Sequence, residues 1–279
     1  MKPLNYFRVL ICLSLIVVTS LSHASFKKNL WTLWVPTNPL STETISHDEW
    51  QTFLDKHVTT DDEGINVIDY QHLSKTDINE LNQYLNRLSD IKITTYNRQE
   101  QLAYWLNLYN ALTVRTIASY YPIDSIQDIN ISPGIFSIGP WGAYLITINN
   151  TPMTLDEIHN RIIRPIWNDN RTHYAINNAT IGAPNLNRTA FNGRNIEEQL
   201  NEAAKQYINT HRGVQIIAGK LMVSKLYRWY VEDFGENDEG IIRHLNQFGD
   251  DKLKNDLKHI QHIENYIYNW HLNQAPTTD

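Results

Sequence analysis

The chain has 279 residues, of which 24 are basic and 30 acidic, and its formal net charge at pH 7 is −6. This balance lacks the basic footprint of a nucleic-acid-binding protein, so we expect no nucleic-acid partner. The only cysteine, Cys12, lies in the first 24 residues, so the remainder has no thiol for a disulfide, a metal site or a nucleophile. That remainder is long enough for one domain with a sizeable hydrophobic core.

Residues 1–24 have the pattern of a secretory signal peptide. Lys2 and Arg8 charge the start, residues 9–21 form an apolar run, and Ser22-His23-Ala24 is a small-x-small cleavage sequence. We expect cleavage after Ala24 and a periplasmic or secreted protein. The run is shorter than a membrane span requires, so an uncleaved anchor is the second interpretation. No later run is long enough, so we expect no membrane span after cleavage.

The first part of the exported chain predicts an arm followed by two helices and a strand. Residues 25–45, which contain tryptophan and proline, are predicted to form an extended N-terminal arm on the domain surface. Ser46 and Glu49 have the spacing of a capping box, which predicts the start of a helix. We expect a short strand at 65–70 from its alternating pattern, and a helix at 75–88 from its apolar spacing.

The segment 97–120 is predicted to be the central helix of the fold. Apolar and aromatic residues fall on nearly every side of it, which is typical of a helix buried within a core. Asn97 marks its start as a capping residue, and Pro122 prevents its continuation. Asn107 and Asn110 are polar exceptions that lie near one another on one flank. If they are buried, their amides require specific hydrogen bonds.

Beyond the central helix the sequence predicts a loop and two hairpins. Proline and glycine residues place the loop at 130–142. Asn149 and Asn150 tolerate the positive φ angles of a tight turn, which predicts the first hairpin, and the second is expected at 214–223. The segment 172–181 is short and apolar, and its periodicity leaves helix and strand both open.

Helices in this half are predicted where a capping residue precedes helical spacing, at Thr154, Asn195 and Ser224. Pro165 is expected to stop the first of them. One further helix is expected to end near Gly249, and an aromatic tail at 266–270 closes the domain. The whole pattern predicts an α+β fold, a single mostly helical domain around the helix at 97–120 with short strands in hairpins.

Seven short segments match one known family in order, at 104–111, 121–126, 155–158, 173–177, 182–186, 229–234 and 268–273. They include YWLNLYNA at the first position and HYAIN at the fourth. In these segments the sequence resembles the DUF547 family, a group of domains named for their unknown function. The resemblance covers nearly the whole exported chain. It implies a DUF547-like domain at 46–274, followed by a C-terminal tail at 275–279.

Two departures from the family pattern bear on chemistry. The family that the sequence resembles has Ile-Glu-His where this chain has Ile158-His159-Asn160, and cysteines where this chain has Asn178 and Ala183. The family's Glu-His pair and both its cysteines are thus replaced. A neutral amide at Asn178 cannot act as a nucleophile in place of a thiolate. The resemblance therefore implies the family fold without thiol chemistry.

We predict a ligand-binding pocket built from polar residues of the central helix and of the segment that starts at His173: Asn107, Asn110, Arg115, His173, Asn177 and Asn178. The alternative is that the two helix asparagines are structural amides and that Arg115 reaches a surface carboxylate. His173 is the one weak catalytic candidate, as a general base, and its alternative role is a core histidine bonded to the backbone.

Other candidate residues predict less. Asp156 with His159, and His259 with His262, have the spacing of paired ligands, but a metal site needs three or four, so we predict no metal site and no cofactor. Four tryptophans form either a sugar- or partner-binding surface patch or part of the core, and they are Trp31, Trp34, Trp50 and Trp167.

The first functional hypothesis is a non-catalytic binding or scaffold protein of the bacterial envelope. Its partner would be an unknown small molecule or an envelope protein. The alternative is a hydrolase-like enzyme in which His173 is the base and either a water molecule or Thr180 is the nucleophile. A purely structural envelope protein is the third hypothesis.

Overall fold

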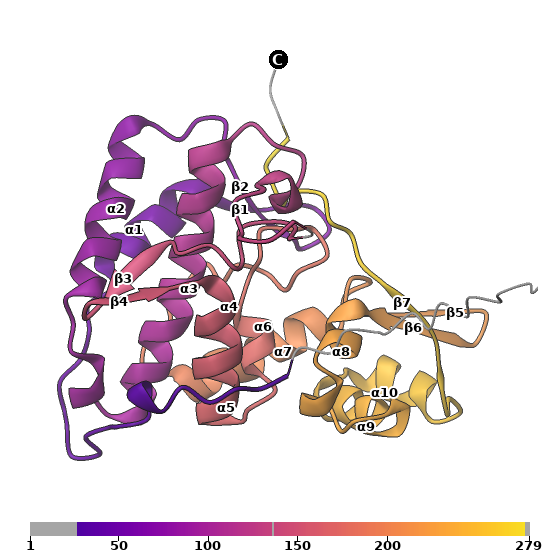
Figure 1. Cartoon of the computed structure of the whole chain (residues 1–279). Coiled ribbons are helices and arrows are strands. Elements are labelled where there is room, and N and C mark those ends of the chain that lie inside the picture. The colour runs from indigo at the N-terminus through magenta and orange to yellow at the C-terminus, as the bar shows by residue number, and fades with distance from the viewer. Residues whose placement is uncertain (1–26, 136, 277–279) are drawn as a thin grey trace, which may run out of the picture.

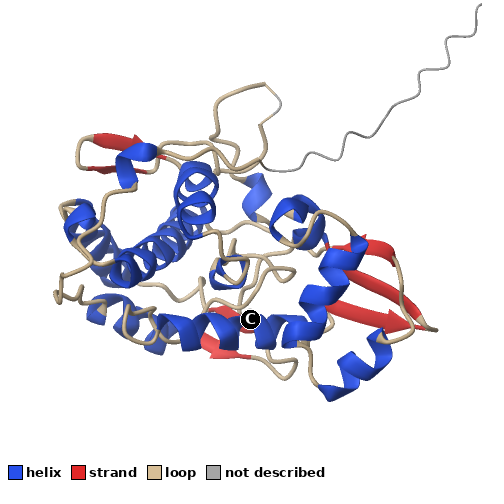
Figure 2. Ribbon diagram, turned by 90° about the horizontal axis from the view of Figure 1, so that it is seen from below, coloured by secondary structure: helices blue, strands red, loops and turns tan. Residues whose placement is uncertain are grey.

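The computed structural model describes residues 27–135 and 137–276 of the chain. The predicted signal peptide at 1–24 therefore lies outside the described residues. Helices dominate and the strands are short, so the predicted α+β class is confirmed (Figure 2). The long central helix lies in one half of the molecule, and a three-stranded sheet with short helices forms the other half (Figure 1).

The first half starts with the predicted arm, in which the described residues include a short turn of 3-10 helix, Thr32–Trp34. Four elements follow: α1 (Asp48–His57), β1 (Val58–Thr60), β2 (Asn66–Ile68) and α2 (Lys75–Ser89). The strands β1 and β2 pair antiparallel. The predicted strand at 65–70 and helix at 75–88 are thus confirmed within a few residues.

The capping box predicted for α1 is wrong. The helix starts at Asp48, and the side chain of the N-cap residue His47 makes no capping hydrogen bond, whereas the Ser46 hydroxyl accepts from the N–H of Asp48 at 3.2 Å. Glu49 instead forms an ion pair with Arg87 on α2, with 2.6 Å between Oε2 and Nη2. The carboxylate that would complete the box is therefore engaged with the neighbouring helix.

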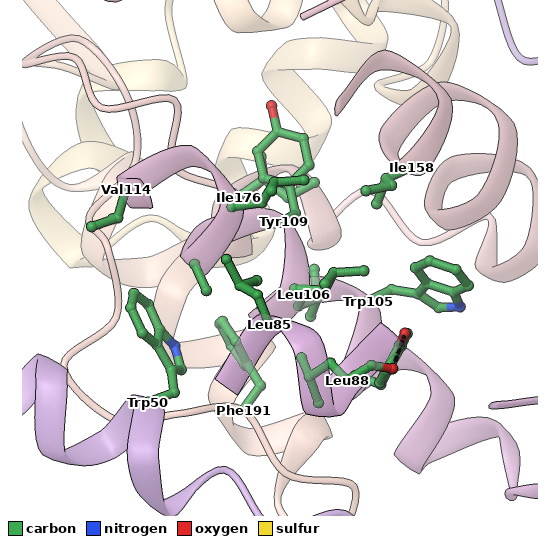
Figure 3. Packing of buried hydrophobic residues seen from close by; sticks show 14 of the residues in the cluster. Trp50, Leu85, Leu88, Trp105, Leu106, Tyr109, Val114, Ile158, Ile176 and Phe191 are labelled. Carbon is green, nitrogen blue, oxygen red and sulfur yellow. Dashed lines mark hydrogen bonds between the residues drawn. The ribbon is translucent and has the colours of Figure 1, made fainter. Parts of the chain in front are cut away.

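The predicted central helix is α3 (Arg98–Tyr120), and its burial is confirmed. The Asn97 side chain accepts a hydrogen bond from the N–H of Glu100 and so caps the helix. Leu106 and Trp105 of α3 pack with Leu85 of α2 and with other buried side chains in Figure 3. Because α3 is buried on most sides, other segments of the chain pack around it. One side of α3 forms part of the wall of a cavity.

After α3 the chain crosses the predicted loop and forms a hairpin of β3 (Ile146–Ile148) and β4 (Thr151–Met153). Asn149 and Asn150 connect the strands with φ angles of 46° and 62°. These positive values are the ones that the paired asparagines predict for a tight turn.

The helix after Thr154 has three parts, which are α4 (Leu155–Glu157), a wide π-helical turn (Ile158–Ile163) and α5 (Arg164–Trp167). The predicted stop at Pro165 is wrong, because this proline lies in the first turn of α5. A proline in that position has no intrahelical N–H bond to break. The undecided segment at 172–181 begins as a short helix, α6 (Thr172–Ala175).

The second half contains α7 (Ile196–Ile208), β5 (Val214–Ile217), β6 (Lys220–Ser224), α8 (Lys225–Trp229), α9 (Asp238–Phe248), α10 (Asp251–Leu257) and β7 (Ile263–Ile267). The hairpin of β5 and β6 is the predicted one, whereas the sequence did not predict β7, which pairs parallel to β6. From β7 the chain returns to the first half, where Leu272 bridges Thr180 and Gln274 bridges Ile68 (Figure 1). This return brings the aromatic tail across the molecule.

Buried apolar side chains form two clusters, one around α3 and one between α7, the β5–β6 hairpin and α9. The helix α6 joins them, since Tyr174 belongs to the second cluster and Ala175 to the first. Trp34 and Trp50 are only 3% and 1% exposed, so the four tryptophans do not form the suggested surface patch. In the part of the chain that the structure describes, no helix has the length and apolar character to cross a membrane.

Candidate functional site

A cavity of about 430 Å³ lies between the two core clusters. Its walls come from α3, the loop at 130–142, the π-helical turn, α6, the end of α8 and the returning C-terminal segment. Polar side chains on the wall are Gln127, Ser132, Ser137, Asp156, His159, His173 and Asn178. Segments from both halves of the chain are therefore needed to close this site.

Aromatic side chains make up much of the wall: Tyr109, Trp141, Trp229, Tyr230, Tyr268 and Trp270. Trp270 has its ring centroid 6.0 Å from that of Trp141, 5.4 Å from that of Trp229 and 4.8 Å from that of Tyr268. Tyr109 lies at the edge of the α3 cluster, and its hydroxyl points away from the other labelled side chains in Figure 3. Such a wall offers large π faces to a ligand.

His173 and Asp233 form a buried pair behind this wall. His173 lies on α6 and Asp233 in the 3-10 turn Val231–Asp233, with 2.7 Å between Nε2 and Oδ2. Asp233 also contacts Arg164 and Lys28, each at 2.7 Å. Burial opposes ionisation of Asp233, but hydrogen bonds from His173, Arg164 and Lys28 outweigh it and hold its pKa well below the usual range. Asp233 is therefore a carboxylate at neutral pH.

The second ring nitrogen of His173, Nδ1, is buried and has no hydrogen-bond partner among residues 27–135 and 137–276. Burial lowers the pKa of His173, although the bond to Asp233 opposes this shift, so the ring is neutral at pH 7. With the proton on Nε2, where Asp233 accepts it, Nδ1 carries a lone pair that can accept a proton.

His159 lies beside His173 on the π-helical turn. The two ring centroids are 5.1 Å apart, and Nδ1 of His159 is 3.4 Å from the hydroxyl of Tyr230. Burial holds the pKa of His159 well below its ordinary value, so this ring is neutral too. Among the described residues, no group of three or more His, Cys, Asp or Glu side chains could hold a metal ion.

Asp156 provides the one carboxylate on the cavity wall. It follows the capping residue Thr154, and its backbone N–H donates to the carbonyl of Trp141 at 3.0 Å. Burial raises the pKa of Asp156, and the charge of Glu157 raises it further. No lysine or arginine lies on the wall as the structure describes it. Asp156 therefore sets the charge of the site.

Asn178 lies on the wall at the place where the resemblance has a cysteine. Its Nδ2 donates to the hydroxyl of Tyr268 at 2.9 Å, and its Oδ1 accepts from the hydroxyl of Thr180 at 2.7 Å. Thr180 is buried, does not line the cavity, and also contacts the Tyr268 hydroxyl at 2.9 Å. The amide thus connects the segment after α6 to the returning C-terminal segment.

Of the six residues predicted to form one pocket, only His173 and Asn178 lie on the cavity wall. Asn107 donates to the carbonyl of Phe191 at 2.7 Å and accepts from its N–H at 2.9 Å. Asn110 bonds in the same way to the carbonyl of Ala175 and the N–H of Asn177. These two amides hold loops against α3, as the alternative interpretation proposed.

The other two predicted residues also bond to the backbone. Asn177 donates to the carbonyl of Pro184 at 2.7 Å, and its Oδ1 accepts from the N–H of Ala179 at 2.8 Å. Arg115 donates to the carbonyl of Leu145 at 2.8 Å rather than to a surface carboxylate. The six predicted residues therefore do not form one pocket. Four of them bind the backbone, and only His173 and Asn178 line the cavity.

Sequence reasoning missed Asp233, Lys28 and the aromatic wall formed by Trp229 and Trp270. Asp233 is sixty positions from its partner in the sequence, and no spacing rule connects them. A signal did exist, because Trp229, Asp233 and Trp270 all fall in segments that resemble the family. These segments indicate the family, but their spacing does not indicate which of their residues lie in the site.

A family model described as "Protein of unknown function, DUF547" matches residues 93–208. The match includes Asp156, His159, His173 and Asn178, and it ends before Trp229 and Asp233. No curated protein sequence matches this chain. No solved structure matches it either.

Proposed function

Because the chain carries a DUF547 domain, a family whose description states no function, we propose a function from the cavity: the protein binds a small organic ligand there. The observation that supports this proposal is the combination of a cavity of about 430 Å³ with six aromatic side chains and a few polar groups. Ligand sites in proteins are commonly concave, mainly apolar and of this size, with a few polar groups that orient the ligand.

Binding without catalysis is the form of the proposal that the side chains favour. Asn178 replaces the cysteine of the family pattern, and its amide is already bonded to Tyr268 and Thr180. An amide is no nucleophile, and the Thr180 hydroxyl does not line the cavity. Neither the Asn178 amide nor the Thr180 hydroxyl is therefore placed for covalent attack on a ligand in the cavity.

We further propose that the protein works outside the cytoplasm, in the periplasm or the bacterial envelope. The support is in the sequence, where charged residues, an apolar run and a small-x-small sequence precede residue 25. A cysteine-free exported domain would depend on its core, and the two clusters of buried side chains supply one. Export is tested by the N-terminal sequence of the processed protein, which should begin at Ser25.

Ligand binding is tested by a thermal-shift screen of amines, sugars, short peptides and cell-wall fragments. A ligand at a hundred times its dissociation constant stabilises the folded state by roughly 2.7 kcal/mol, which raises the melting temperature measurably. The Trp229→Ala variant should lose this shift, because Trp229 supplies part of the wall. Trp167→Ala is the matched control, since Trp167 is also partly buried but does not line the cavity. A hit that both variants retain contradicts the assignment of the cavity.

A hydrolase is the second candidate, and the His173–Asp233 pair favours it. Nδ1 of His173 would accept a proton from a water molecule as the water oxygen attacks a carbonyl carbon. Asp156, whose pKa is raised by burial, would in its protonated form give a proton to the leaving group. Such a reaction requires a neutral base and an acid with a raised pKa, and the environments of His173 and Asp156 shift their pKa values in these directions.

The two candidates are separated by changing His173 to Gln and assaying turnover of ester and amide panels. A hydrolase should lose turnover in this variant while it still binds ligand, because the aromatic wall remains. Equal turnover in the variant and the wild type would exclude His173 as the base. Absence of turnover in the wild type, together with a saturable ligand, would leave the binding function alone.

A further inference from the structure

The cavity wall carries one formal charge. Asp156 is its only acidic residue, and no lysine or arginine is among the lining residues that the structure describes. The two histidines on the wall are neutral, since burial lowers the pKa of each. The ligand therefore meets a site of net charge near −1 that lies between aromatic side chains.

The Asp156 carboxylate has no cation beside it. Within 27–135 and 137–276, no ion pair and no side-chain hydrogen bond involves its oxygens. Its neighbour Glu157 is paired with Arg161 at 2.9 Å, and the buried Asp233 has three basic partners. The protein thus compensates the acids near the cavity and leaves Asp156 uncompensated. Asp156 is partly buried, and a partly desolvated charge without a partner is less stable than one in water, so a cationic ligand beside it would be favoured.

The aromatic rings that line the cavity together with Asp156 stand at angles to each other. The plane of Trp270 makes angles of 73° with Trp141, 44° with Trp229 and 56° with Tyr268. Their centroids are 4.8–6.0 Å apart, so these rings pack against one another, and together they present a continuous aromatic wall to the cavity. Tyr230 contributes less, because His173 stacks on it at 4.2 Å and Arg164 lies 4.7 Å from its ring centroid.

We infer that the ligand carries an alkylated ammonium group, which lies against the aromatic wall of Trp141, Trp229 and Trp270 and whose charge Asp156 balances. Aromatic faces attract such cations through the ring quadrupole, and the attraction is strongest where water is excluded. The inference rests on the proposed binding function and names the chemical class of the ligand.

The test compares choline with 3,3-dimethylbutan-1-ol, its uncharged carbon isostere, by isothermal titration into the purified protein. Both have the same shape, so a difference in affinity reports the charge alone. Choline is expected to bind roughly tenfold or more tightly than the isostere. Asp156→Asn should remove that preference and leave binding of the isostere unchanged. Glu157→Gln is the matched control and should keep the preference, because Glu157 does not line the cavity and a glutamine can still serve the capping box.

Three results would overturn the inference. Equal affinity of the wild type for both compounds would show that the cavity binds shape and not charge, and the proposed binding function would stand. Unchanged preference in Asp156→Asn would remove this carboxylate from the site. Binding of neither compound would exclude an ammonium site, and the thermal-shift screen of other ligand classes would then decide the binding function separately.

Discussion

Buried histidines should make the protein less stable as the pH falls from about 7.5 to about 5. His47 and His244 are both buried, and burial is the main reason that their pKa values fall from 6.5 to about 4. The charge of Arg87 adds to the shift of His47, and that of His173 to the shift of His244. The hydroxyls of Tyr84 and Tyr174 lie 2.6 and 2.7 Å from these rings.

The sign and size of the effect follow from linkage. As the pH falls through 6.5, these histidines become protonated in the unfolded chain but stay neutral in the folded chain. The free energy of unfolding therefore falls. For a pKa that drops from 6.5 to about 4, the loss between pH 7.5 and 5 is about 2 kcal/mol per histidine, or about 4 kcal/mol for both. His159 and His173 act in the same direction, and Asp156, whose pKa is raised, acts in the opposite one.

A loss of this size is a large part of a typical domain stability of about 5–15 kcal/mol. The assay is urea unfolding followed by tryptophan fluorescence at both pH values. His244→Gln should lose about 2 kcal/mol less than the wild type over the same range, because glutamine does not titrate and can still accept from Tyr174. His262→Gln is the matched control, since its side chain is exposed. Equal unfolding free energies of the wild type at the two pH values would refute the reasoning.

Four other changes test the contacts that support the site. Asn110→Leu leaves the carbonyl of Ala175 and the N–H of Asn177 unpaired, so urea unfolding should show a loss of about 3 kcal/mol, and an unchanged midpoint would contradict this. Trp50→Ala removes a fully buried ring that stacks on Phe53, and calorimetry should show a lower melting temperature from a loss of about 3–5 kcal/mol. Arg164→Met should cost about 3–5 kcal/mol because it strips a fully buried partner from Asp233. Lys28→Met should cost about 1 kcal/mol or less, because the lysine side chain is 27% exposed, and equal losses in the two variants would be inconsistent with this difference.

Local patterns predicted the elements of this fold well. The helix α3 starts at the capping residue Asn97 and is apolar on most sides, so its position and its burial follow from its own residues. The turn at Asn149 and Asn150 has the positive φ angles that asparagine tolerates. Each of these features depends on interactions within a few residues. The family resemblance could be recognised from the sequence for the same reason, because it consists of short contiguous segments.

The sequence predictions were wrong where a polar side chain binds a partner that is distant in the sequence rather than a nearby one. Glu49 forms an ion pair with Arg87 instead of the expected capping box. The side chains of Asn107 and Asn110 donate hydrogen bonds to backbone carbonyls that are far away in the sequence. A polar residue in a buried helix shows that a partner exists, but its spacing does not say whether that partner is a ligand or the backbone.

By itself the sequence determined the class of the fold, its central helix and the absence of any cysteine after Cys12, because these depend on composition and short-range periodicity. Only the tertiary structure decided which residues line the cavity. The parallel pairing of β7 with β6 and the return of the chain to Thr180 bring Trp270 opposite Trp141, and the turn after α8 brings Asp233 to His173. Such contacts join residues far apart in sequence, and they form only when both core clusters have packed, so no local pattern encodes them.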